Sequence, residues 1–160
     1  MSALMDAVRA NDAARVRELI EQGADVDELE AGGDAPLVMA AYEGFTEVVR
    51  LLLEAGADVA AVDPGMRATA LHAAAYAGRT EAARLLIAHH IDVDRQGPEN
   101  GYTALHDAVW QNHVETARVI IEGGANLYLR SKDGKTPLDF ARARRAREIA
   151  AMIEERLARQ

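Results

Sequence analysis

The apolar positions of the chain recur with a period of 33 or 34 residues. Five leucines mark this period: Leu4, Leu37, Leu71, Leu105 and Leu138. Each is followed by small residues, then by a turn residue, then by a second apolar stretch. That second stretch carries pairs in the same register, which are Leu19-Ile20, Leu52-Leu53, Leu86-Ile87 and Ile120-Ile121. A repeat of this length with two apolar segments predicts stacked units of two short helices each.

The residue between the two apolar segments of each unit predicts a tight turn. Asn11, Gly44, Gly78 and Asn112 occupy this position, and these residue types tolerate a positive φ. The fifth unit has Arg145 instead, so a less sharp turn is expected there. Gly-Ala closes the second segment in three units, as expected for a left-handed helix cap, and His90-Ile91 replaces it in the third.

A four-residue motif precedes the first helix of three units. It reads Thr69-Ala70-Leu71-His72, then Thr103-Ala104-Leu105-His106, then Thr136-Pro137-Leu138-Asp139. Together with the period and the turn residues, this motif resembles the ankyrin repeat over essentially all 160 residues. The second unit departs from the pattern with Ala35-Pro36-Leu37-Val38, and the first begins almost directly with its helix.

The resemblance implies an all-α fold, an ankyrin-repeat solenoid of five helix-turn-helix units with projecting β-turn loops. It also implies a single domain over residues 1–160, with units of approximately 1–27, 28–60, 61–94, 95–127 and 128–160. Two short helices cannot bury their apolar faces alone, so neighbouring units must share a continuous core. About ten helices and little or no regular sheet are therefore expected.

The charge and composition of the chain indicate which kinds of partner and cellular location to expect. The formal net charge is −8, all of it contributed by residues 1–80, whereas residues 81–160 are neutral. A nucleic-acid partner is not expected, because phosphate binding needs a basic surface. Neither a membrane span nor a signal-like apolar segment is apparent, so a cytoplasmic protein is expected. Sixteen arginines against two lysines suggest a GC-rich, bacterial coding sequence.

Catalytic and metal-binding patterns are weak. The chain has no cysteine, no nucleophile motif and no phosphate-binding glycine loop, so we expect no enzyme and no cofactor. His72 and His106 are interpreted as helix-opening residues that bond turn backbone, and His113 as an exposed helix-start residue. His89 and His90 precede two aspartates, but adjacent helical side chains diverge by about 100° and share a metal poorly. No metal site is therefore predicted.

The position five residues after each leucine is expected to face the concave surface that the resemblance implies. It is occupied by Arg9, Tyr42, Tyr76, Trp110 and Ala143, so three successive aromatic residues share one register. The next column offers Glu43, Ala77, Gln111 and Arg144. The turn tips add Asp34, Met66, Arg67, Tyr102 and Lys135, of which Met66 and Tyr102 are expected to be exposed. The alternative is that the aromatic rings pack on one another and cover the alanine-rich helices.

The function that these features favour is non-catalytic protein binding, through the concave face and the turn tips of a monomer. One alternative is a small inhibitor or immunity-type protein that occludes a partner enzyme. In that case the acidic cluster of Asp25, Asp27, Glu28, Glu30 and Asp34 would dock on a basic site; a merely solvated face is the simpler interpretation of this cluster. A second alternative is a scaffold or assembly subunit. The sequence names no partner.

Overall fold

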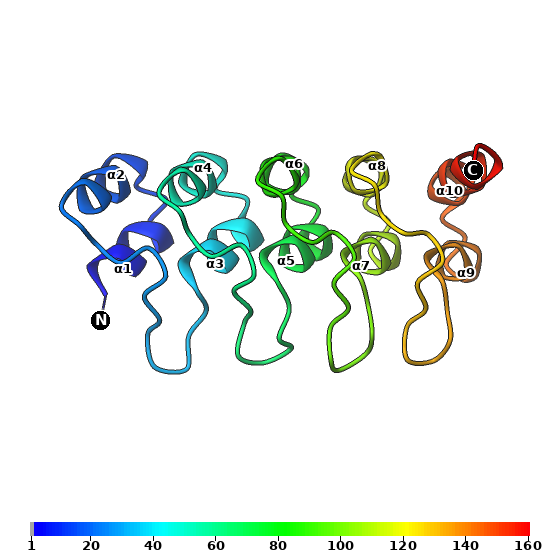
Figure 1. Ribbon diagram of the computed structural model, residues 1–160, viewed down its shortest axis with the longest axis horizontal. Helices are drawn as coiled ribbons and strands as arrows, with labels where there is room; N and C mark the ends of the chain where they lie inside the picture. The colour runs from blue at the N-terminus through cyan, green and yellow to red at the C-terminus, as the bar shows by residue number, and fades with distance from the viewer. Residues whose placement is uncertain (1) are drawn as a thin grey trace.

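The computed structural model describes residues 2–160, which form ten helices in two parallel rows (Figure 1). The inner row consists of α1 (Ala3–Arg9), α3 (Pro36–Glu43), α5 (Ala70–Ala77), α7 (Ala104–Trp110) and α9 (Pro137–Ala143). The outer row consists of α2 (Ala13–Glu21), α4 (Thr46–Glu54), α6 (Thr80–Ala88), α8 (Val114–Glu122) and α10 (Arg147–Ala158). Within residues 2–160 the β-structure amounts to one isolated bridge between Val62 and Thr69. The predicted all-α repeat solenoid is confirmed.

The threonine of the recurring motif caps the start of α5, α7 and α9. In α5 the Thr69 side chain accepts a hydrogen bond from the backbone N–H of His72, and the His72 ring accepts one from the backbone N–H of Thr69. Thr103 and His106 form the same reciprocal pair at α7. The two bonds satisfy backbone groups that a helix start otherwise leaves unpaired. In the last unit Asp139 replaces histidine and still completes the pair with Thr136.

The turns between inner and outer helices all require a left-handed residue. Gly44 and Gly78 have φ values of 74° and 73°. An added Cβ at Gly78 would lie 2.7 Å from a ring atom of His113, so the close approach there also excludes larger residues. Arg145 was expected to give a less sharp turn, but it adopts φ of 57° and the turn is retained. His90, in place of the capping glycine, likewise adopts φ of 65°.

Arg145 therefore holds a conformation that L-residues other than glycine adopt at a cost. We expect Arg145→Gly to raise the free energy of unfolding by about 0.5 to 1 kcal/mol, because relief of left-handed strain exceeds the added flexibility of the unfolded chain. Urea unfolding measures the change. Arg145→Ala keeps the strain while removing the guanidinium, so it should give no comparable gain; equal gains from both variants would contradict the strain argument.

The core runs the length of the stack between the two rows. Leu37, Leu71 and Leu105 are each 1% exposed, and the alanines that follow them let successive inner helices approach closely. The wider outer row is filled by larger side chains, including Leu52, Leu86, Ile120, Ile149 and Ile153. The small residues of the inner row and the larger ones of the outer row together fill the space between the helices. Within residues 2–160, no helix is both long and apolar enough to cross a membrane.

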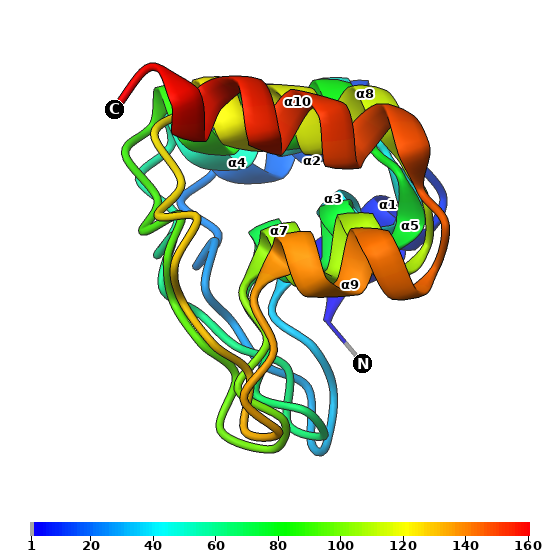
Figure 2. The same cartoon turned by 90° about the vertical axis from the view of Figure 1, so that its right-hand side faces the viewer.

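Four loops lead from an outer helix to the next inner helix and project together from one side of the stack (Figure 2). Side-chain to backbone bonds hold their shape. In the second loop the Asp63 carboxylate accepts hydrogen bonds from the backbone N–H groups of Gly65, Met66 and Ala68, at 2.7 to 2.9 Å. The loops and the inner helices thus form two adjoining walls, and the concave face is the surface that lies between these walls.

Candidate protein-binding groove

The angle between the loops and the inner helices contains a cavity of about 590 Å³, here called the concave groove. Its lining combines aromatic and apolar side chains with three carboxylates and no lysine or arginine. The aromatic members are Tyr42, Tyr76, Tyr102, Trp110 and His72. Met66 and Val38 add apolar surface, and the carboxylates are Asp34, Asp63 and Asp107.

Three of the five helix-borne residues at the predicted register line the groove as neighbours along one wall. Tyr42, Tyr76 and Trp110 come from α3, α5 and α7, and they remain 47%, 49% and 38% exposed. Within residues 2–160 no ring contact joins these three side chains to each other. Trp110 packs instead on Phe140, with ring centroids 5.5 Å apart, while the Arg144 guanidinium lies 4.2 Å from the Trp110 ring centroid. The rings therefore do not form a closed stack over the alanines.

Tyr102 differs from the expectation of an exposed turn tip. Its ring stacks on His106 at 5.7 Å between centroids and meets the edge of Phe140 at 5.1 Å, and the residue is partly buried. Its backbone carbonyl also accepts a 2.9 Å hydrogen bond from His72 Nε2. The prediction of exposure is wrong because this residue sits at the base of its loop, where the loop docks on the inner helices. The ring still contributes to the groove wall.

Asp107 was not among the predicted site residues, and it lies in the groove one turn before Trp110 on α7. Residues three apart share a helix face, so the carboxylate and the indole face the same space. Burial raises the pKa of Asp107 to about 7, and no charge or hydrogen-bond donor in residues 2–160 offsets this effect. The sequence did contain a signal: the equivalent positions in the neighbouring units are the apolar Ala73 and Phe140.

The other predicted residues divide into two groups. Asp34 and Met66 line the groove, and burial together with the charge of Asp63 raises the pKa of Asp34. The remaining members of the predicted set are outside its lining: Arg9, Glu43, Arg67, Ala77, Gln111, Lys135 and Arg144. Arg67 and Lys135 are exposed on loops, as expected for turn tips.

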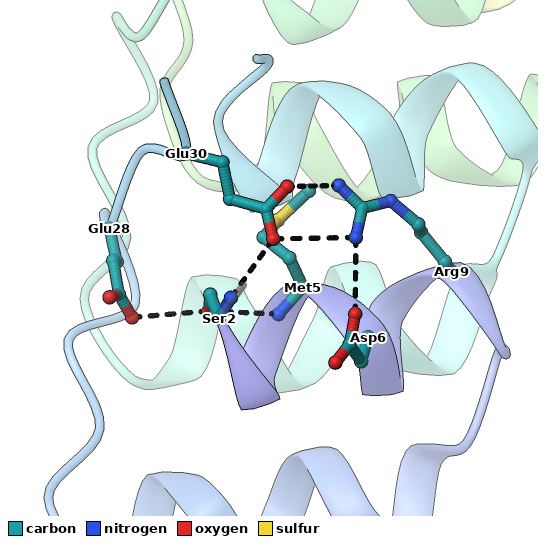
Figure 3. A network of polar contacts seen from close by, with 6 residues as sticks. All are labelled: Ser2, Met5, Asp6, Arg9, Glu28 and Glu30. Atoms are coloured by element: carbon teal, nitrogen blue, oxygen red, sulfur yellow. Dashed lines mark hydrogen bonds and ion pairs between the residues drawn. The ribbon is translucent and has the colours of Figure 1, made fainter. Parts of the chain in front are cut away.

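Arg9 is engaged within the chain at the N-terminal end of the stack (Figure 3). Its guanidinium pairs with Glu30 through both nitrogens and contacts Asp6 at 3.3 Å. Glu30 also accepts the backbone N–H of Ser2 at 3.0 Å, and Glu28 accepts the Ser2 hydroxyl at 3.1 Å. Hydrogen bonds from Arg9 and Ser2 lower the pKa of Glu30. Two members of the acidic cluster, Glu28 and Glu30, therefore form hydrogen bonds with the first helix and its N-cap residue.

Three histidine side chains form hydrogen bonds with backbone carbonyl groups of the next or the preceding unit. Burial lowers the pKa of both His72 and His106, and the Nε2 atoms donate to the carbonyls of Tyr102 and Lys135 at 2.9 Å. The expectation that His113 is simply exposed is wrong, since it is partly buried and its Nε2 donates to the Tyr76 carbonyl at 3.0 Å. Across residues 2–160, no group of three or more potential ligands is placed to hold a metal ion.

Stacked two-helix units joined by projecting loops define a helical repeat protein. The model of the family "Ankyrin repeats (3 copies)" matches residues 1–63 and 60–131, which is most of the chain. The chain belongs to the ankyrin repeat family.

Two similar curated proteins are much longer than this chain. The E3 ubiquitin-protein ligase Ufd4 of Drosophila melanogaster is 33% identical over 155 residues, which cover 94% of this chain and 4% of that protein. The ankyrin repeat and SAM domain-containing protein 6 of Danio rerio is 48% identical over 54 residues, covering 33% of this chain and 7% of that protein. The similarity therefore concerns the repeats and a small fraction of each relative.

Proposed function

We propose that the chain is a non-catalytic module that binds a segment of a partner protein in the concave groove. The observation that carries this proposal is the alignment of Tyr42, Tyr76 and Trp110, each more than a third exposed, along one wall of a 590 Å³ groove. Large side chains at such exposure retain apolar area that a partner can cover. The ankyrin repeat family, whose members generally bind other proteins, supports the same function.

The groove has the features of a binding surface rather than of a catalytic centre. Aromatic side chains bury a large area for few rotatable bonds and keep a polar tip, so they are frequent anchors of protein interfaces. Besides the carboxylates, the polar groups of the lining are tyrosine hydroxyls, the Asn100 amide and the Trp110 N–H, and the ring nitrogens of His72 are already bonded to backbone or to Thr69. That leaves no base and nucleophile paired in the groove.

Trp110→Ala tests the groove directly. We expect the dissociation rate of a partner captured from the native cell to rise at least tenfold, because about 1.4 kcal/mol corresponds to a factor of ten and truncating a central aromatic anchor removes about 2 kcal/mol or more. Surface plasmon resonance with the captured partner measures the rate.

Two further variants make this experiment decisive. Tyr42→Ala removes a groove ring that contacts no other ring within residues 2–160, so its effect on binding is separable from packing on Phe140. Tyr128→Ala removes a ring that is 63% exposed outside the groove lining, and it should leave dissociation unchanged. Equal dissociation from the parent, Trp110→Ala and Tyr42→Ala proteins would reject the groove as the binding surface.

A further inference from the structure

Asp107 is the feature of the groove that protein binding through aromatic anchors leaves unexplained. Its side chain is partly buried in the groove lining beside Trp110, yet no hydrogen-bond donor or cation in residues 2–160 compensates the carboxylate. The contrast with Asp6 is direct, because Asp6 has the same position in the first unit and is paired with Arg9 at 3.3 Å. A buried carboxylate without a partner is unfavourable unless another molecule supplies the opposite charge.

The charges around Asp107 indicate that the bound molecule carries a positive charge. Asp34 and Asp63 line the groove together with Asp107, and no lysine or arginine does so. Two arginines close to the lining are engaged within the chain: Arg144 lies over the Trp110 ring, and Arg95 Nη1 bonds the Ala60 carbonyl at 3.4 Å. The faces of aromatic rings also attract cations, most strongly where water is excluded.

We propose, building on the proposed function, that the groove accepts a lysine or arginine side chain of the partner, flanked by apolar residues, with its cation at Asp107 beside Tyr76 and Trp110. The flanking apolar side chains cover the exposed rings and Met66. The stem of the basic side chain is itself apolar and packs well in such a groove. The occupant is therefore a basic-apolar segment of another protein.

Binding of this cation is linked to the protonation of Asp107. Below its pKa the carboxyl is neutral and loses most of its attraction for the cation, so affinity should rise with pH and level off above about pH 8. With a pKa of about 7, the ionised fraction, and with it the affinity, increases about tenfold from pH 6 to pH 8.

The other titratable groups around α7 do not produce this profile. On α5, burial lowers the pKa of His72, and on α9 Asp139 has a lowered pKa and bonds Thr136. On α8, Glu115 pairs with Arg118. Tyr102, at the base of its loop, has a raised pKa, and Asp34 and Asp63 lie farther along the groove. Each of these groups remains in an Asp107→Asn variant, which isolates the contribution of Asp107.

The test begins with a displayed library of random linear peptides, selected on the full chain at pH 8. We expect the enriched peptides to share one lysine or arginine between apolar residues, and the same selection on Asp107→Asn to lose this preference. Glu122→Gln, which removes one exposed charge on α8 away from the groove lining, should retain it. Enrichment of purely apolar or acidic peptides would overturn the proposal.

One enriched peptide is then measured by fluorescence anisotropy. Replacing its basic residue by norleucine should weaken binding to the parent protein about tenfold and leave binding to Asp107→Asn unchanged, which is the coupling expected of two groups in contact. Affinity should rise about tenfold from pH 6 to pH 8 for the parent and not for Asp107→Asn. Loss of both effects overturns the role of Asp107.

The outcomes separate this inference from the proposed function. Peptides that need Trp110 but not Asp107 would leave the groove as the binding surface and remove the cation site. No peptide that depends on Trp110 would reject both. Sedimentation of the parent protein gives a third arm: a dimer that Asp107→Asn dissociates would assign the groove to a second copy of the chain and overturn the partner segment.

Discussion

Leu86→Ala is expected to lower the free energy of unfolding by about 2 to 5 kcal/mol. Leu86 is fully buried on α6, which packs between α4 and α8 in the outer row. Truncation removes contacts to both neighbouring units and leaves a cavity that the stack cannot close without shifting its helices. Because each unit is stabilised mainly by its neighbours, a defect in the central unit weakens two interfaces at once.

Two matched variants identify the source of that loss in urea or guanidinium unfolding. Leu85→Ala makes the same change one residue earlier, where the side chain is only partly buried, and should cost clearly less. Tyr76→Ala removes a larger side chain that is 49% exposed in the groove and should also cost less than Leu86→Ala. A loss from Tyr76→Ala as large as that from Leu86→Ala would mean that the aromatic residues hold the fold together.

The repeat architecture was predictable because its signals are local and recur in register. The leucine period, the Thr-x-x-His motif and the inter-helix Gly or Asn each act within a few residues of chain. The structure places them as expected, down to the positive φ of Asn11 and Asn112. Even Arg145 follows the register, since the packing of α9 and α10 imposes the left-handed turn on a residue that does not favour it.

Contacts between units were harder to predict. The pairing of Arg9 with Glu30, the bond from His113 to the Tyr76 carbonyl and the packing of Tyr102 on Phe140 join residues 21 to 38 positions apart. Such contacts depend on the rotation of one unit against the next, which the sequence period does not specify. The aromatic wall of the groove was found because its members share a register, whereas Tyr102, at the base of its loop, was misjudged as a tip.

Asp107 was missed for a different reason. A carboxylate on an inner helix is typical of a solvated face, and Asp6 in the same register is indeed exposed and paired. Only the walls supplied by α5, the loop base and Trp110 turn the environment of Asp107 into a largely apolar one. The same residue type at one register is thus paired with Arg9 in the first unit and desolvated without a partner in the fourth.

Because burial disfavours the charged form of Asp107, we expect Asp107→Asn to raise the free energy of unfolding near neutral and alkaline pH, by about 2 to 4 kcal/mol at pH 8. The pKa of Asp107 is about 7 in the folded chain, against 3.8 for an unperturbed aspartate. Three pKa units correspond to roughly 4 kcal/mol as an upper value, because each unit is worth about 1.4 kcal/mol. Asparagine has the same shape and is never charged, so it avoids this penalty.

The sign of the pH dependence follows from which state binds the proton more tightly. Since the folded pKa is raised, the favourable contribution of protonated Asp107 is fully present below pH 3.8 and is lost as the pH rises through about 7. The advantage of Asp107→Asn should therefore be small at pH 4, grow between pH 4 and 7, and stay constant above pH 8. His72 and His106 titrate in both proteins, so their contributions cancel in the difference.

Urea unfolding of the two proteins across this range gives the curve directly. A difference that is flat with pH would show that Asp107 has an ordinary pKa in the folded chain. If Asp107→Asn is more stable and also loses the preference for basic peptides, the ionised Asp107 lowers the stability of the free protein and a bound cation neutralises its charge.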